Sequence, residues 1–165
     1  MNNLIIGVDG FARLQEGHEI NINQIKTKAF KVGTLPTGIT GVRGGDLLVY
    51  TEATQVYAIP DSAKAAGDYT GKIAGIALAT NVKTDVMFPQ SKSEVEFAPG
   101  EHGACLVTGE VAVPLNGAAP TEGATVYYSA ANRAFTTVQS GNIACPNMKF
   151  SGITEGTLTV VNVLY

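Results

Sequence analysis

The sequence predicts an all-β protein, a compact β-barrel or β-sandwich with an N-terminal arm and at most one short helix. Short runs rich in Val, Ile, Thr, Tyr and Phe recur between clusters of Gly, Pro and Asn, and apolar repeats with helical spacing are almost absent. We therefore expect strands at residues 46–51, 55–59, 72–78, 82–88, 95–97, 104–108, 110–114, 125–129, 134–138, 148–153 and 158–164.

Two hairpins are predicted near the C-terminus. Residues 125–129 and 134–138 flank a short polar loop, in which Asn132 suits a left-handed turn position. The strands before and after Thr154-Glu155-Gly156 form the second hairpin, with Gly156 supplying the positive φ. The last strand, 158–164, carries apolar side chains on both faces, so we expect it to be central or covered on both sides.

Three further local patterns lie in the middle of the chain. Residues 61–67 are the one plausible helix, with Asp61 or Ser62 as N-cap and Gly67 as its stop. Gly75 interrupts an apolar strand, which predicts a bulge or a close crossing of two backbones. The pattern around Thr108-Gly109 predicts two strands joined there.

The first 40 residues differ from the rest of the chain. We expect an N-terminal arm or edge-strand segment over 1–40 and a barrel or sandwich over 41–165, within one folding unit. Residues 19–25 alternate apolar and polar types, and residues 26–31 interleave three lysines with one phenylalanine. Such a segment either adds a strand to a neighbouring subunit or forms an ordinary edge strand whose lysines block aggregation.

Composition excludes several classes of protein. With 45% hydrophobic and 15% charged residues, the chain is not intrinsically disordered. Two cysteines cannot make a disulfide-dense scaffold or, unaided, a four-ligand structural zinc site, and we expect both to be reduced and buried. The net charge of −3 argues against a nucleic-acid partner. We expect no membrane partner, because no apolar run approaches the roughly 20 residues that cross a bilayer.

Charge is unevenly distributed along the chain. Residues 1–45 hold five basic and three acidic residues, whereas the remainder holds six basic and eleven acidic residues. The basic front end suits an acidic partner surface, although ordinary scatter in a small sample explains the same numbers. The first ten residues have no basic leader and only a short apolar run, so we expect no secretory signal.

The candidate catalytic motifs lack the residues or the spacing that their reactions require. The stretch 67–73 resembles a phosphate-binding loop, but three residues separate its glycines and Ile73 follows the lysine. His102 precedes Cys105 by three residues within a glycine-rich turn and a strand, which seldom aligns a base with a nucleophile.

Two carboxylate-containing patterns are equally weak. His18 lies beside Glu16 and Glu19 but lacks further metal ligands. Glu94 and Glu96 share one face of a strand, which is more typical of solvent-facing acids than of a catalytic pair. We therefore predict no catalytic residue, no cofactor and no metal site.

A series of short motifs resembles a known family. In order they are Gly44-Gly-Asp-Leu-Leu-Val49, Gly71-Lys-Ile-Ala-Gly-Ile-Ala-Leu78, Phe97-Ala-Pro-Gly-Glu101, Val107-Thr-Gly-Glu-Val-Ala-Val113 and Gly123-Ala-Thr-Val-Tyr127. This order, over about residues 40–164, is similar to that of the head decoration proteins of tailed bacteriophages, also called structural cement or auxiliary capsid proteins. Residues 1–40 match the pattern poorly.

The resemblance implies a structural role. Such a protein sits on the outside of the assembled head, bridges neighbouring major capsid subunits and resists internal DNA pressure. Its expected partners are the major capsid protein and copies of itself, as a trimer or a dimer, and it would be made in the host bacterial cytoplasm.

The resemblance does not indicate which residues contact the capsid. From the charge asymmetry and one aromatic residue, we expect the contact surface to comprise Lys26, Lys28, Phe30 and Lys31, with Arg43 nearby and Phe30 as the anchor. Two other functions stay open. One is a tail- or fibre-associated module that binds host glycans. The other is a small β-barrel hydrolase, but the sequence shows no set of nucleophile and base residues that would favour it.

Overall fold

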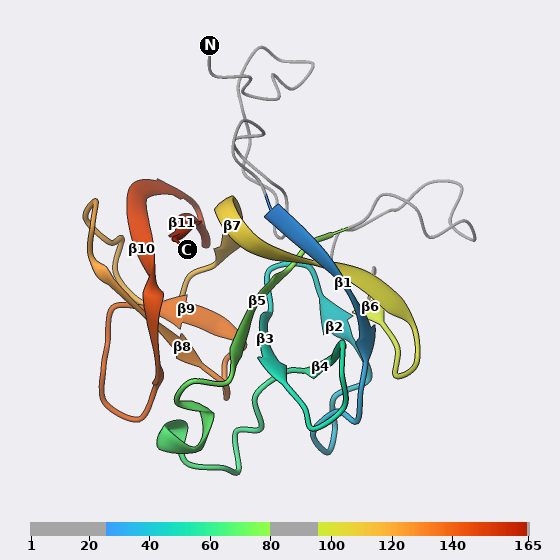
Figure 1. The fold of residues 1–165 in the computed structure, drawn as a ribbon. Helices are drawn as coiled ribbons and strands as arrows, with labels where there is room; N and C mark the ends of the chain where they lie inside the picture. The colour runs from blue at the N-terminus through green and yellow to red at the C-terminus, as the bar shows by residue number, and fades with distance from the viewer. Residues whose placement is uncertain (1–25, 80–95, 165) are drawn as a thin grey trace.

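The computed structural model describes residues 26–79 and 96–164, and it confirms the all-β prediction (Figure 1). Its strands are β1 (Lys26–Val32), β2 (Val42–Arg43), β3 (Leu47–Tyr50), β4 (Val56–Ala58), β5 (Ile73–Ala77), β6 (Glu96–Phe97), β7 (His102–Pro114), β8 (Thr125–Ser129), β9 (Ala134–Thr136), β10 (Ile143–Glu155) and β11 (Leu158–Val163). The expected strand at 82–88 lies outside the described residues.

Five strands close into a barrel in the order β1-β4-β3-β5-β7, because β7 also pairs with β1. The β1–β4 pairing is parallel and the other pairings of the barrel are antiparallel. A second, antiparallel sheet continues from β7 through β11, β10 and β8 to β9. The short strands β2 and β6 pair separately. In Figure 1, β7 runs from the barrel to the side of the molecule that holds β8–β11.

Strand β7 corrects the expectation of two separate strands joined at Thr108-Gly109. The chain does not turn back there, and His102–Pro114 form one strand of 13 residues. Gly109 has a φ of +132°, which glycine adopts at little cost. The strand therefore changes conformation without ending, pairing with β1 over 102–108 and with β11 over 109–114.

Two hydrophobic cores lie on opposite faces of the β3–β5–β7 region. One fills the barrel, with Phe30, Leu48, Tyr57 and Cys105 among its buried residues. The other lies between the barrel and the second sheet, and includes Leu47, Ile76, Leu106, Val161, Tyr128 and Phe135. Leu47 and Leu48 thus face different cores, since successive side chains of a strand point to opposite faces.

Strand β1 is part of the barrel. Residues 26–31 pair antiparallel with β7, and Lys31 and Val32 pair with β4 of the same chain. Within residues 26–40, β1 is therefore one strand of the barrel. Residues 1–25 lie outside the described part of the chain.

Both predicted hairpins are confirmed, with one change in a turn. Ser129 pairs with Ala134 in the first hairpin, but the left-handed residue is Arg133, at a φ of +49°, rather than Asn132. The second turn contains Gly156, at a φ of +58°. The last strand, β11, lies between β7 and β10 and is central as predicted.

The predicted helix is displaced. Asp61 accepts a hydrogen bond from the backbone N–H of Ala63 at 2.9 Å, which forms a local turn instead of capping a helix. A single 3₁₀ turn, η2, follows at Ala66–Tyr69, with no side-chain hydrogen bond at its N-cap. Gly67 therefore lies within this turn and does not end it.

Gly75 marks a close crossing, as predicted. Its φ is +152°, and a Cβ built there would lie 2.1 Å from the carbonyl oxygen of Leu106 and 2.6 Å from Sγ of Cys105. The β3–β5 register also shifts beside it, between Leu48 and Val49. The backbones of β5 and β7 approach closely only because position 75 has no side chain.

We predict that Gly75→Ala destabilises the protein by about 3 kcal/mol or more, since overpacking and backbone strain combine at this position. Urea unfolding followed by circular dichroism measures the change. Gly67→Ala is the matched control, because nothing lies within 4 Å of a Cβ there. Equal stability of the two variants would contradict the close-crossing interpretation.

Candidate functional site

The three lysines predicted as contact residues lie together on β1. Lys26, Lys28 and Lys31 are all exposed. They lie on a strand that is paired with β7, so their backbone positions are set by the barrel. Lys28 faces Cys105 across the β1–β7 pair, and its charge acts on the Cys105 thiol. Lys28 and Lys31 are three positions apart and point to opposite faces of the strand, so β1 carries basic side chains on both of its faces.

Phe30, between these lysines in the sequence, is not exposed with them. Its side chain is 1% exposed, and its ring stacks on Tyr57 with centroids 5.7 Å apart. It also meets Phe97 edge-on at 6.5 Å. Phe30 and Val32 face the barrel interior because alternate residues of β1 point inward. Phe30 therefore stabilises the basic strand from inside the barrel and is not presented to a partner as an anchor.

Tyr50 is the aromatic side chain that reaches the surface beside β1. It is 46% exposed, and its ring meets Tyr57 edge-on at 5.4 Å. Since Tyr57 in turn stacks on Phe30, a row of rings joins Tyr50 to the barrel core. The sequence analysis missed Tyr50, whose only signal is an aromatic residue at the end of an apolar strand.

Arg43 lies apart from the lysines, on β2 of the small β2–β6 sheet. It is half-buried, and within the described residues its Nε has no hydrogen-bond partner. The backbone N–H of Arg43 donates to Oδ2 of Asp46 at 2.7 Å. The structure thus places Arg43 beside a buried carboxylate rather than on the β1 strand.

That carboxylate forms a buried ion pair that the sequence analysis missed. Asp46 is fully buried, and Arg133 donates to it through Nη2 and through Nε, the latter at 3.2 Å. The Tyr128 hydroxyl donates to Asp46 Oδ1 at 3.3 Å, and Arg133 Nη2 also donates to the carbonyl of Gly41 at 2.9 Å. The pair joins the barrel to the β8–β9 hairpin.

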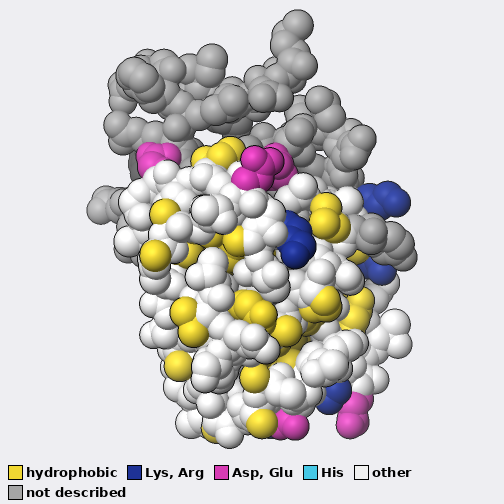
Figure 2. All heavy atoms as spheres, turned by 90° about the vertical axis from the view of Figure 1, so that its left-hand side faces the viewer, with side chains coloured by type: hydrophobic (Ala, Val, Ile, Leu, Met, Phe, Trp, Pro, Cys, Tyr) yellow, Lys and Arg dark blue, Asp and Glu magenta, His cyan; other side chains and the backbone are white. Residues whose placement is uncertain are grey.

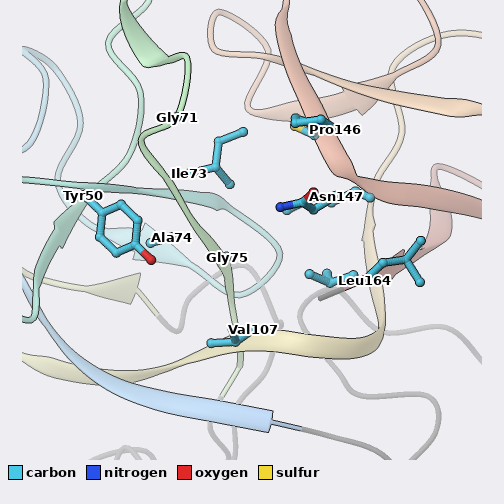
Figure 3. A pocket seen from close by; sticks show the side chains of 12 residues that line it. Tyr50, Gly71, Ile73, Ala74, Gly75, Val107, Pro146, Asn147 and Leu164 are labelled. Carbon is cyan, nitrogen blue, oxygen red and sulfur yellow. The ribbon is translucent and has the colours of Figure 1, made fainter.

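A cleft of about 360 Å³ lies between β5 and the β10–β11 end of the second sheet. Figure 3 shows Tyr50, Ala74 and Gly75 on one side, with Pro146, Asn147 and Leu164 on the other and Val107 below. The ionisable residues that line it are Tyr50 and Cys145. Its lining is therefore mostly apolar side chains and backbone.

Within residues 26–79 and 96–164, the sequence motifs considered for catalysis do not assemble into a site. Burial raises the pKa of the Cys105 thiol to about 12, so the nucleophilic thiolate is strongly disfavoured, while His102 is exposed. Glu96 accepts a hydrogen bond from Thr40 at 2.9 Å and lies 3.8 Å from Arg133 Nη1. Glu94, Glu16, His18 and Glu19 lie outside the described residues.

Among the described residues, no group of three or more His, Cys, Asp or Glu side chains is placed to hold a metal ion. Within residues 26–79 and 96–164, no helix has the length and apolar character needed to span a membrane.

The face formed on the β8–β11 side carries few charges. Figure 2 shows mostly uncharged polar surface with scattered hydrophobic side chains, and most charged side chains near its margins. Val138, which follows β9, is 55% exposed, and Ile153, which lies on β10, is 50% exposed. The molecule therefore has chemically different surfaces, with exposed lysines on β1 and a nearly uncharged face on the second sheet.

Comparison with known proteins identifies the family. A family model described as "Structural cement protein (E217 gp24/Pam3 gp6)", of phage cement proteins, matches residues 17–164. The chain belongs to this family. The resemblance predicted from the sequence is confirmed, and this cement protein has a structural role in the phage capsid.

The fold is also found in a solved structure. A chain of "The capsid of Myoviridae Phage XM1" has a TM-score of 0.66 and 20% sequence identity, and the match covers 92% of this cement protein and 90% of that chain. No curated protein sequence matches significantly. The barrel with its added sheet is therefore shared with a phage capsid component at low sequence identity.

We predict that Arg133→Ala costs the cement protein about 3–5 kcal/mol of unfolding free energy, because it leaves the buried Asp46 carboxylate without its cation. Tyr128→Phe is the milder comparison, expected to cost about 1 kcal/mol by removing one hydrogen bond. Urea unfolding at pH 7 measures both. A loss below 1 kcal/mol for Arg133→Ala would show that the pair contributes little.

We also predict that the cement protein loses stability at alkaline pH. Burial raises the pKa of both cysteine thiols from 9.0 to about 12, and burial beside Asp46 raises that of Tyr128. The unfolded chain therefore releases these protons first, so stability falls from about pH 9 upwards by about 1.4 kcal/mol per pH unit for each thiol. Urea unfolding between pH 8 and 11 tests this, and Cys145→Ala should reduce the slope.

Proposed function

We propose that this cement protein binds the outer surface of the assembled head and holds neighbouring major capsid subunits together. The observation that carries the proposal is the family match over residues 17–164. A closed barrel and its attached sheet supply rigid surface, which suits adhesion. On a lattice, each weak contact is repeated many times, so the total binding greatly exceeds that of one contact. We further propose synthesis in the cytoplasm of the bacterial host.

The proposed contact residues are Lys26, Lys28 and Lys31 on β1, together with Arg43, which lies apart from them on β2. Support comes from the exposure of the three lysines and from their position on a strand of the barrel. Phe30 is not retained as the anchor because it is buried. Exposed cations act by complementing an acidic partner surface, which raises association rates and selects partners.

We also propose that the protein self-associates as a trimer or a dimer. The nearly uncharged face on the side of the second sheet supports this, because interface cores are depleted of charged residues (Figure 2). Sedimentation velocity of the purified protein at several concentrations tests the proposal. A monomer at every concentration, in solution and when released intact from heads, would exclude it.

Co-sedimentation with expanded, undecorated phage heads tests the proposed function. We expect saturable binding, quantified on gels, and extra density at regular positions outside the lattice in electron micrographs. Decorated heads should also survive heating or osmotic shock better than bare heads. A folded protein that binds none of several head preparations would overturn the proposal.

The lysines of β1 allow a separate prediction. We expect Lys28→Glu/Lys31→Glu to reduce the apparent affinity for heads at least about tenfold at low salt, because two attractive contacts become repulsive. Lys64→Glu/Lys72→Glu makes the same change of net charge at exposed positions elsewhere and should bind like the wild type. Equal loss in both variants would indicate a dependence on net charge alone.

A further inference from the structure

The half of β7 that belongs to the second sheet is paired with β11 along one edge. The backbone N–H of Leu115 donates to Thr157 at 2.8 Å, toward β11. Backbone groups of successive strand residues point to opposite edges, so alternate residues before Leu115 face away from β11. These are Glu110, Ala112 and Pro114. Among the described residues, no strand pairs with β7 at these three positions on the edge away from β11.

Strand β1 lies along this same edge and begins where the edge becomes unpaired. Lys26, the first described residue, pairs with Thr108. β5 and β11 lie on the other edge of β7, because Gly75 and Leu164 border one cleft with Val107 between them. Figure 3 shows Gly75 and Leu164 on one side of β7 and β1, in pale blue, on the other. The chain that precedes Lys26 is therefore attached at the start of the unpaired edge.

The far end of this edge is closed by β9. The backbone N–H of Asn116 donates to Phe135 at 2.7 Å, and Leu115 forms an isolated parallel bridge with the same residue. Pro114 has no N–H to donate, and proline within a sheet is typical of an edge. The unpaired stretch is therefore residues 109–114, between β1 at one end and β9 at the other.

Residues 20–25 have the sequence of a strand that fits this stretch. Residues 19–25 alternate apolar and polar types, and positions 20–25 hold no charged residue. The match to the cement-protein family begins at residue 17, so the segment belongs to the shared domain. It precedes β1 directly and has the same length as 109–114, so it reaches the whole stretch without a connecting loop.

We propose that residues 20–25 continue β1 as an antiparallel strand along residues 109–114 of the same chain. The pairing extends the register that Lys26 and Thr108 already have. The pairs that result are Gln24 with Glu110 and Ile22 with Ala112. An extended segment bonds to a free sheet edge through its backbone, and the side chains beside that edge determine which segment fits.

Side chains along the edge fit this segment. Ala112 pairs with Val160 of β11, and Ile22 would extend this apolar surface, because directly opposite residues share a face of the sheet. The Oγ1 atom of Thr108 is buried and has no hydrogen-bond partner among the described residues, which is costly. Gln24 would lie diagonally across from Thr108 on the same face, within reach of a long amide side chain.

The pairing has two consequences for contacts with other chains. It covers an edge to which a foreign strand could otherwise add. It also brings residue 19 to the end of the edge beside β9, so residues 1–19 would leave the fold on the side of the second sheet instead of at the start of β1.

The variant Gln24→Cys/Glu110→Cys tests the proposal. Cα atoms of a hydrogen-bonded antiparallel pair are about 5.5 Å apart, which a disulfide can bridge. On mild oxidation of the dilute, purified full-length protein we expect a disulfide within one chain, identified by gel mobility and by mass spectrometry of the linked peptides. The native cysteines, Cys105 and Cys145, are buried and should not compete.

Asn23→Cys/Glu110→Cys is the matched control. A shift of one residue turns the side chain to the other face of the sheet, so we expect at least about tenfold less cross-linked protein. Equal cross-linking in the two variants would show that the segment contacts β7 without a fixed register, which overturns the proposal.

Hydrogen exchange gives a second readout, in the wild-type protein. The amides of Glu110 and Ala112 face the edge, so we expect slow exchange, as for other paired strands. Gln24→Pro removes an N–H that would bond to Glu110 and should speed exchange at both amides at least about tenfold. Asn23→Pro, whose N–H would face away from β7, should change it by no more than about twofold.

Each other outcome overturns the proposal. Cross-links between two chains would show that a second copy fills the edge. Slow exchange without any cross-link would show that a different segment covers it, and rapid exchange of both wild-type amides would show that it is open. All these measurements use the protein without phage heads, so their failure leaves the proposed cement function untouched.

Discussion

The uninterrupted course of β7 is the constraint on which the rest of the fold depends. This single strand closes the barrel against β1 and then forms the first strand of the second sheet against β11. The two halves are therefore fixed by a continuous backbone and its hydrogen bonds instead of a flexible linker. The core between them includes Leu106 on the barrel part of β7 and Val111 on the sheet part, so separating the halves would expose apolar surface on both.

The Asp46–Arg133 pair is the second link between the halves. Burial of a carboxylate is costly, and the attraction of a bidentate guanidinium offsets that cost only in good geometry. Asp46 has such geometry, with Arg133, Tyr128 and the backbone of Arg43 as donors. An apolar contact at this place would tolerate sliding of the hairpin over the barrel, whereas these directional bonds define one position.

Local features of the fold could be predicted from the sequence, and features that join distant segments could not. The β10–β11 hairpin and the crossing at Gly75 follow from turn residues and from a glycine within an apolar strand. The continuity of β7 through Gly109 depends on pairing with β1 and β11, and the sequence around it is equally typical of a turn. Asp46 and Arg133 are 87 residues apart, with no spacing motif to connect them.

For the candidate contact residues, too, the local feature could be predicted from the sequence and the feature that depends on distant segments could not. The exposure of Lys26, Lys28 and Lys31 agrees with their charge, since lysine is rarely buried. Phe30 was misjudged because an isolated phenylalanine among lysines gives no sign of which face of the strand is covered. That face is settled by Tyr57 and Phe97, which reach Phe30 from other strands.

The burial of the two cysteines determines how the protein responds to oxidation. Cys105 lies in the barrel core and Cys145 in the core between the halves, and both are free thiols and are at most 1% exposed. Oxidation acts on accessible thiolates, which burial suppresses at both positions. These two thiols are therefore shielded from forming or exchanging disulfide cross-links, so the fold is insensitive to a change from reducing to oxidising surroundings.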